Sequence, residues 1–129
     1  MKVLVDTSVW SLVLRRKEEA EIVKRLADLI LSSLVVMIGP VRQELLSGIS
    51  DATVFDRLRA TLKAFDDFPI TTHDYVTAAK FYNTCRAHGI QGSHIDFLIC
   101  AVAYNNNFHI YTTDKDFGNY ARYLPIGIL

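Results

Sequence analysis

The stretch Lys2-Val3-Leu4-Val5-Asp6-Thr7-Ser8-Val9 decides how the chain folds, because an uninterrupted apolar run ends abruptly in an acid. Continuous apolar residues with β-branched character are typical of a strand that is covered on both faces, as in a parallel sheet. Asp6, Thr7 and Ser8 favour the start of a helix, so a helix is predicted to follow the strand immediately. Asp6 therefore lies at the carboxyl end of a strand, which is the edge where open α/β sheets bind ligands.

The rest of the chain alternates strands with helices in the same way. Apolar runs at 34–38 and 110–113 predict two more buried strands, and weaker edge strands are expected at 68–71 and 124–129. Apolar residues at helical spacing and helix-start signals predict helices in the intervening segments, at about 9–14, 20–31, 41–46, 52–65, 73–86, 94–104 and after 114. This order favours an α/β fold, a three-layer α/β/α sandwich around a mostly parallel central sheet, formed by residues 1–129 as one domain.

Composition restricts the classes of function. Lys and Arg number 14, as do Asp and Glu, so the net charge is zero and RNA binding would rest on local charge, such as the basic stretch 15–17, or on a metal. Cys85 and Cys100 show no C-x-x-C spacing and are expected to be buried thiols in a reducing cytoplasm. No signal-peptide pattern and no apolar run of roughly 20 residues is present, so no membrane association is expected.

Four acids occupy related positions in the predicted fold. Asp6 and Asp114 follow buried strands, Asp96 opens a buried helix, and Glu44 lies one turn into the helix after the second strand. Each has an ordinary alternative: Asp6 and Asp114 as helix caps, Asp96 as the third residue of a capping box with Ser93, and Glu44 as a surface residue. If the strands are parallel, however, all four lie near one edge of the sheet.

A cluster of carboxylates predicts a bound cation. Several carboxylates brought together repel one another and raise one another's pKa, so such an arrangement calls for a compensating positive charge. Oxygen ligands without histidine or cysteine suit Mg²⁺ or Mn²⁺, which are typically held by one or two carboxylates and substrate phosphate oxygens. The predicted chemistry is therefore hydrolysis of a phosphodiester bond with the aid of the ion.

Polar neighbours of the acids are candidates for supporting roles. The hydroxyls of Thr7, Ser8 and Thr113 are expected either to orient a carboxylate or a water or simply to cap a helix. Arg42 and Lys115 are the cations expected nearest the site, although a solvated surface position remains the simpler interpretation of both.

Four segments of the chain resemble the motifs of the PIN-domain family, in the family's order and with similar separations. They are Val3-Leu4-Val5-Asp6-Thr7-Ser8-Val9, Glu44-Leu45-Leu46-Ser47-Gly48, Ser93-His94-Ile95-Asp96-Phe97-Leu98-Ile99 and Thr112-Thr113-Asp114-Lys115-Asp116-Phe117. The similarity covers essentially the whole chain. The short single-domain form is similar to the VapC-type toxins of toxin-antitoxin pairs.

The resemblance implies a Mg²⁺- or Mn²⁺-dependent endoribonuclease toxin. It implies Asp6 and Asp96 as direct metal ligands, with Glu44 and Asp114 holding a water or a second ion. Asp116 lies in the same motif as Asp114, and the resemblance leaves open which of the two faces the metal. It also implies an RNA substrate, a homodimer, and a small antitoxin that inserts a segment across the site.

Two other functions compete with this interpretation. One is a catalytically silent PIN-like module that only binds a partner, against which the presence of all four acids argues. The other is a phosphohydrolase of the haloacid-dehalogenase kind, in which an acid would follow Asp6 two residues later, where this chain has Ser8.

Overall fold

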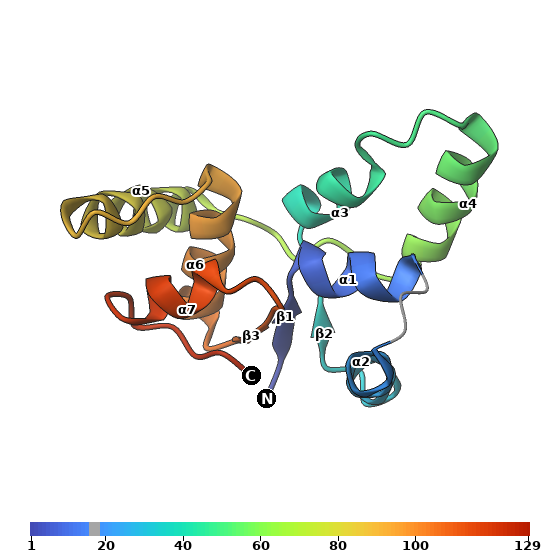
Figure 1. Cartoon of the computed structure of the whole chain (residues 1–129), viewed down its shortest axis with the longest axis horizontal. Coiled ribbons are helices and arrows are strands. Elements are labelled where there is room, and N and C mark those ends of the chain that lie inside the picture. Colours follow the sequence, from blue (N-terminus) through green and yellow to red (C-terminus); the bar gives the residue numbers. More distant parts are fainter. Residues whose placement is uncertain (16–18) are drawn as a thin grey trace.

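The computed structural model describes residues 1–15 and 19–129, so Arg16 and Lys17 of the basic stretch lie outside the described residues. Three short strands and seven helices follow one another along these residues (Figure 1). In chain order they are β1 (Val3–Val5), α1 (Thr7–Leu14), α2 (Ala20–Leu31), β2 (Val35–Val36), α3 (Gly39–Leu46), α4 (Ala52–Leu62), α5 (Thr72–Ala87), α6 (His94–Asn106), β3 (His109–Tyr111) and α7 (Asp116–Ala121).

The sheet is parallel, and the first strand of the chain is its centre. The strand order is β2-β1-β3, with Val3 opposite Val35 on one side and His109 on the other. Helices α1 to α4 lie to one side of the sheet and α5 to α7 to the other (Figure 1). All three residues of β1 are fully buried, which explains the continuous apolar run. The predicted α/β fold, a parallel sheet flanked by helices, is confirmed.

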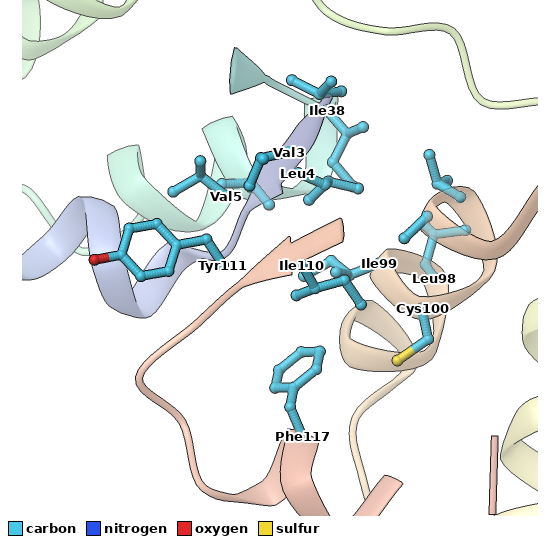
Figure 2. Packing of buried hydrophobic residues seen from close by; sticks show 14 of the residues in the cluster. Val3, Leu4, Val5, Ile38, Leu98, Ile99, Cys100, Ile110, Tyr111 and Phe117 are labelled. Atoms are coloured by element: carbon cyan, nitrogen blue, oxygen red, sulfur yellow. The ribbon is translucent and has the colours of Figure 1, made fainter. Parts of the chain in front are cut away.

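Helix α6 is the most deeply buried helix. Its residues from Phe97 to Ala103 are all buried, so it is apolar around its whole circumference as the sequence predicted. Ile99 of α6 belongs to the same hydrophobic cluster as Ile110 of β3 and Phe117 of α7, and the three side chains lie close to one another in Figure 2. This packing fixes the start of α6 relative to the sheet.

Three predicted strands are shorter than expected or absent. The second strand is only Val35–Val36, and segment 68–71 is not a strand. In its place a single bridge joins Met37 to Asp67, and the Phe68 amide donates to the Met37 carbonyl at 2.7 Å. Pro69 has no amide hydrogen with which to continue the ladder. The terminal segment 124–129 contributes one bridge, from Ile128 to Ile110, rather than a strand.

The described part of the chain contains no helix that combines the length and the apolar character needed to cross a bilayer.

Parallel pairing brings the ends of β1 and β3 to one edge of the sheet. The Asp6 amide donates to the Tyr111 carbonyl at 2.9 Å, so the residue that follows β1 lies beside the end of β3. Helices α1 and α3 pack against each other on the neighbouring side, where α3 carries Glu44. The segments that carry the acids of the sequence prediction therefore approach the same edge.

Candidate functional site

Asp6 occupies a helix N-cap position, but its carboxylate does not cap the helix. It lies immediately before α1, and no hydrogen bond joins its side chain to that helix's backbone. Its Oδ2 atom instead accepts hydrogen bonds from Ser8 Oγ at 2.7 Å and from Thr112 Oγ1 at 2.8 Å. The residue is only 5% exposed. Two hydroxyls from different elements thus hold one oxygen of a buried carboxylate, and the capping interpretation is wrong for this residue.

Asp96 closes only half of the capping box that the sequence predicted. Its amide donates to Ser93 Oγ at 3.1 Å, but its carboxylate does not return to the Ser93 amide. Oδ2 accepts a hydrogen bond from the Tyr120 hydroxyl at 2.7 Å instead. The side chain is therefore turned away from the helix start and towards α7.

The surroundings of Asp96 raise the pKa of its carboxyl group. Burial raises the pKa of the Asp96 carboxyl above its ordinary value, and the negative charges of Asp6 and Asp114 raise it further. The hydrogen bond from the Tyr120 hydroxyl lowers the same pKa, as does the neighbouring Ser93 hydroxyl. Burial and the bond to Asp96 also raise the pKa of Tyr120, so its hydroxyl remains a donor. Asp6 and Asp114, from two other segments, therefore lie near enough to Asp96 to raise its pKa.

Glu44 is linked to this group through the first helix. It is exposed on α3, and its Oε1 atom accepts a hydrogen bond from Thr7 Oγ1 at 2.8 Å. Because Thr7 directly follows Asp6, this bond ties the second motif to the first. Thr7 and Ser8 both orient carboxylates, which was one of the two interpretations that the sequence left open.

Asp114 and Asp116 have different surroundings. The Asp114 Oδ1 atom accepts a hydrogen bond from the Asp116 amide at 2.9 Å, and its own amide donates to Thr112 Oγ1 at 3.0 Å. Asp116 is exposed and raises the pKa of Tyr120. Thr113 contributes its backbone amide, which donates to Ser8 Oγ at 3.0 Å, whereas the carboxylate-orienting hydroxyl belongs to Thr112.

The four acids share one bonding pattern. In each, one carboxylate oxygen accepts hydrogen bonds and the other has no hydrogen-bond partner among the described residues. The unpartnered atoms are Asp6 Oδ1, Glu44 Oε2, Asp96 Oδ1 and Asp114 Oδ2. Oxygen atoms of this kind are the donors that Mg²⁺ and Mn²⁺ prefer.

The acids do not form a closed coordination shell. Within residues 1–15 and 19–129, no three carboxylate, imidazole or thiol side chains converge closely enough to hold one ion. Mg²⁺ normally keeps several waters and takes only one or two protein carboxylates. The donor chemistry therefore fits a hydrated divalent ion, with most of the coordination sphere left to water or substrate.

The basic residues near this edge differ from those expected. Arg42 is bound to Asp67 Oδ1 at 2.9 Å and to the carbonyl oxygens of Leu62 and Phe65, so it anchors the end of α4. Lys115 is exposed beside Asp114.

Sequence reasoning missed two other cations. A hollow of about 560 Å³ beside Thr112 and Thr113 is lined by Lys24 and Arg25 of α2 together with two acids of the same helix, Glu21 and Asp28. The Arg25 guanidinium lies 5.8 Å from the centre of the Tyr111 ring. Helix α2 is distant in sequence from every acidic motif, so no local signal indicated this position.

Tyr120 is another residue near the acids that the sequence did not reveal. It lies 24 residues beyond Asp96, and its aromatic character indicated only a core position. Its role depends on a tertiary contact for which the sequence contains no local signal.

Comparison with known proteins gives a consistent set of similarities. The family profile described as PIN domain matches residues 3–123. No curated protein gives a significant match. Among solved structures, a chain of FitAcB from Neisseria gonorrhoeae superimposes with a TM-score of 0.80 at 21% identity, covering 98% of this chain and 96% of that one.

Two further solved structures have the same fold over the full chain. A chain of VapBC-1 from nontypeable Haemophilus influenzae has a TM-score of 0.76 at 16% identity. A chain of DNA-bound VapBC from Salmonella typhimurium has a TM-score of 0.79 at 16% identity. In both cases the superposition covers 100% of this chain and 97% of the other.

Proposed function

The chain belongs to the PIN-domain family, and from this premise we propose that it is a metal-dependent endoribonuclease that hydrolyses phosphodiester bonds in RNA. The proposal treats residues 1–129 as one catalytic domain. The observation that carries it is the hydrogen-bond network at one edge of the sheet, where Thr112 Oγ1 donates to Asp6 Oδ2 at 2.8 Å and accepts from the Asp114 amide at 3.0 Å. The charges of Asp6 and Asp114 also raise the pKa of Asp96, which lies near them.

We assign the metal ligands from the unpartnered carboxylate oxygens. Asp6 Oδ1 and Asp96 Oδ1 would hold Mg²⁺ or Mn²⁺ directly, while Glu44 and Asp114 would hold coordinated water or a second ion. A bound ion would supply a Lewis acid for the phosphodiester and an activated water for attack on phosphorus.

The chain's own side chains orient these groups. Ser8 and Thr112 fix Asp6 Oδ2, so that Oδ1 keeps one direction. Thr7 fixes Glu44 Oε1 in the same manner, which leaves Oε2 to accept the proton of the attacking water. Glu44 is suited to this role because it is exposed and reaches solvent.

Asp114 is the more suitable fourth acid. Its amide donates to Thr112 Oγ1, the hydroxyl that also holds Asp6, and the Asp116 amide donates to Asp114 Oδ1. We therefore assign Asp116 to the support of Asp114. The assignment predicts that Asp114→Asn reduces RNA cleavage more than Asp116→Asn does.

RNA binding would draw on local charge. The neutral chain has no general attraction for nucleic acid, but Lys24 and Arg25 line the hollow beside Thr112 and Thr113. Phosphates on either side of the cleaved bond would be held there by these two cations.

The proposed biological role is that of a VapC-like toxin. It would form a homodimer and be inhibited by a small antitoxin that inserts a segment across the acidic site. Support comes from the solved structures of the same fold, which are those of FitAcB and VapBC complexes. Cys85 and Cys100 are buried and unpaired, as expected in the reducing cytoplasm where we place the protein.

The decisive experiment measures RNA cleavage by the purified full chain in Mn²⁺ or Mg²⁺. We expect Asp6→Asn and Asp96→Asn to lower cleavage of a panel of single-stranded and structured RNAs by at least about a hundredfold, since each removes charge where the ion binds. A chelator should abolish cleavage by the wild-type chain.

Asp66→Asn is the matched control, because Asp66 is an exposed aspartate on the loop after α4. This variant should cleave as the wild type does. Cleavage that persists in Asp6→Asn, or in the presence of chelator, would contradict the proposal.

The competing function is a catalytically silent module. Its support is that no three potential ligand side chains converge in the described part of the chain. Calorimetric titration of the wild-type chain with Mn²⁺ separates the two functions: the nuclease binds the ion, and the silent module does not.

A further inference from the structure

Among the described residues, Tyr120 is the one outside the four sequence motifs whose side chain donates a hydrogen bond to a proposed metal ligand. Its side chain is fully buried, and its ring packs against Phe97 at 4.9 Å and Phe117 at 5.2 Å between ring centres. Its hydroxyl donates to Asp96 Oδ2 at 2.7 Å. A ring held on two sides gives this hydroxyl a fixed position.

Asp96 is consequently held at two points. Ser93 Oγ accepts from its amide, and Tyr120 donates to one of its carboxylate oxygens. The first contact fixes the backbone at the start of α6, and the second fixes the rotation of the carboxylate. Together they leave Oδ1 as the oxygen that is available to a ligand.

Gly92 provides an independent indication that the position of the Tyr120 hydroxyl beside Asp96 depends on the residues around it. A Cβ atom at this position would lie 2.4 Å from the Tyr120 hydroxyl oxygen, 2.8 Å from Tyr120 Cζ and 2.9 Å from Phe97 Cε2. These separations are far below van der Waals contact, so the loop before α6 has space for the phenol only because residue 92 has no side chain. The backbone at Gly92 is not left-handed, so the requirement is for space and not for conformation.

We propose that Tyr120, seated against Gly92, is a positioning residue that selects Oδ1 of Asp96 as the metal-binding oxygen. The inference rests on the proposed function, because it assumes that Asp96 holds Mg²⁺ or Mn²⁺. Hydrogen-bond partners of metal ligands typically change metal affinity by ten- to a hundredfold. Tyr120 acts on the ion only through Asp96.

The test is the affinity of the full chain for Mn²⁺, measured by calorimetry without RNA. Tyr120→Phe keeps the ring and removes the hydroxyl, and we expect it to weaken Mn²⁺ binding about ten- to a hundredfold. Tyr123→Phe is the matched control, since Tyr123 lies three residues away and its hydroxyl has no hydrogen bond among the described residues. The control should bind Mn²⁺ as the wild type does.

A double variant distinguishes positioning from a general structural effect. Because Tyr120 acts through Asp96, Tyr120→Phe should cause no further loss of Mn²⁺ binding in an Asp96→Asn background. A similar loss in both backgrounds, or wild-type affinity in Tyr120→Phe, would overturn the inference while leaving the proposed nuclease intact. A wild-type chain that neither binds Mn²⁺ nor cleaves RNA would overturn both.

Gly92→Ala tests the same contact from the other side. The added methyl group collides with the phenol, so this variant should also weaken Mn²⁺ binding and lower the urea midpoint of unfolding. Adding Tyr120→Phe removes the shortest of the three contacts, and the midpoint should recover in part. Additive losses in the double variant would show that Gly92 and Tyr120 are not coupled, which contradicts the inference.

Discussion

Helices α5 and α6 begin with the same sequence pattern but use it differently. Each has a hydroxyl residue at the N-cap and an aspartate three residues later, Thr71 with Asp74 and Ser93 with Asp96. At α5 the box is closed: the Thr71 hydroxyl accepts from the Asp74 amide, and Asp74 Oδ2 accepts from the Thr71 amide at 2.9 Å. At α6 only the first of these two bonds forms.

The difference lies in what surrounds each carboxylate. Asp74 is 3% exposed, and its second oxygen accepts from Asn105 Nδ2 at 2.8 Å, so both oxygens are occupied. Asp96 has one oxygen bound by Tyr120 and one without a partner in the described chain. A carboxylate with both oxygens occupied contributes to stability, whereas one with a free oxygen is available to a ligand. By this comparison Asp74 is a structural acid, whereas Asp96 keeps one oxygen available to the proposed metal ion.

The same substitution at both positions should have opposite effects, and this is the largest difference that we expect. Asp96→Asn should lower RNA cleavage at least about a hundredfold and change the free energy of unfolding by less than about 0.5 kcal/mol. Asp74→Asn should keep cleavage but lower the free energy of unfolding by about 1–3 kcal/mol, because an amide has only one acceptor oxygen for the donors of Thr71 and Asn105. RNA cleavage and urea unfolding of both variants test this pair, and equal effects on activity would contradict it.

This contrast also marks the limit of what the sequence could predict. The strands and helices with strong local patterns, β1, α2 and α6, are found where the apolar periodicity placed them. The capping box was predicted at α6 because local spacing is all that the sequence displays. The partner that redirects Asp96 is Tyr120, which reaches it only through tertiary packing.

Other parts of the site show the same limit. The sequence placed the acids at one sheet edge because parallel strands end together, and the segments of Asp6 and Asp114 do meet there at the Thr112 hydroxyl. Arg42 was predicted either as a cation near the site or as a solvated surface residue, but it binds Asp67 and the carbonyl oxygens of Leu62 and Phe65 instead. Loop conformation has no period that a sequence pattern can reveal.

Removing the N-cap hydroxyls of α5 and α6 should affect stability equally but RNA cleavage unequally, and the difference in cleavage should be smaller than that between the two aspartate substitutions. Thr71→Ala and Ser93→Ala each remove one bond to a helix amide, so each should lower the free energy of unfolding by about 1 kcal/mol. Only Ser93→Ala should also reduce cleavage, by a few fold, because Ser93 holds the backbone of Asp96. Unfolding curves and initial cleavage rates measure both effects, and an equal loss of activity in Thr71→Ala would weaken the comparison.

The smallest expected effect is in the pH dependence of stability. The pKa of Asp96 is higher in the folded chain than its ordinary value of about 4. As pH rises past about 4, the unfolded chain therefore loses the Asp96 proton at a lower pH than the folded chain does. The contribution of Asp96 to stability is therefore full below about pH 4 and is lost as pH rises through the raised value. Urea unfolding of the wild type and of Asp96→Asn at several pH values measures this contribution as the difference between their free energies of unfolding. That difference should fall as pH rises, and an increase with pH would contradict the assigned direction.

The central position of β1 has a consequence for how the protein is made. Val3–Val5 are synthesised well before His109–Tyr111, one of their two neighbouring strands, and the Thr112 hydroxyl that holds Asp6 lies 106 residues further along the chain than Asp6. Contacts between such distant parts of a chain form only after the intervening segment has been synthesised. A nascent chain therefore cannot assemble this acidic edge, and any nuclease activity begins only after β3 has emerged and paired.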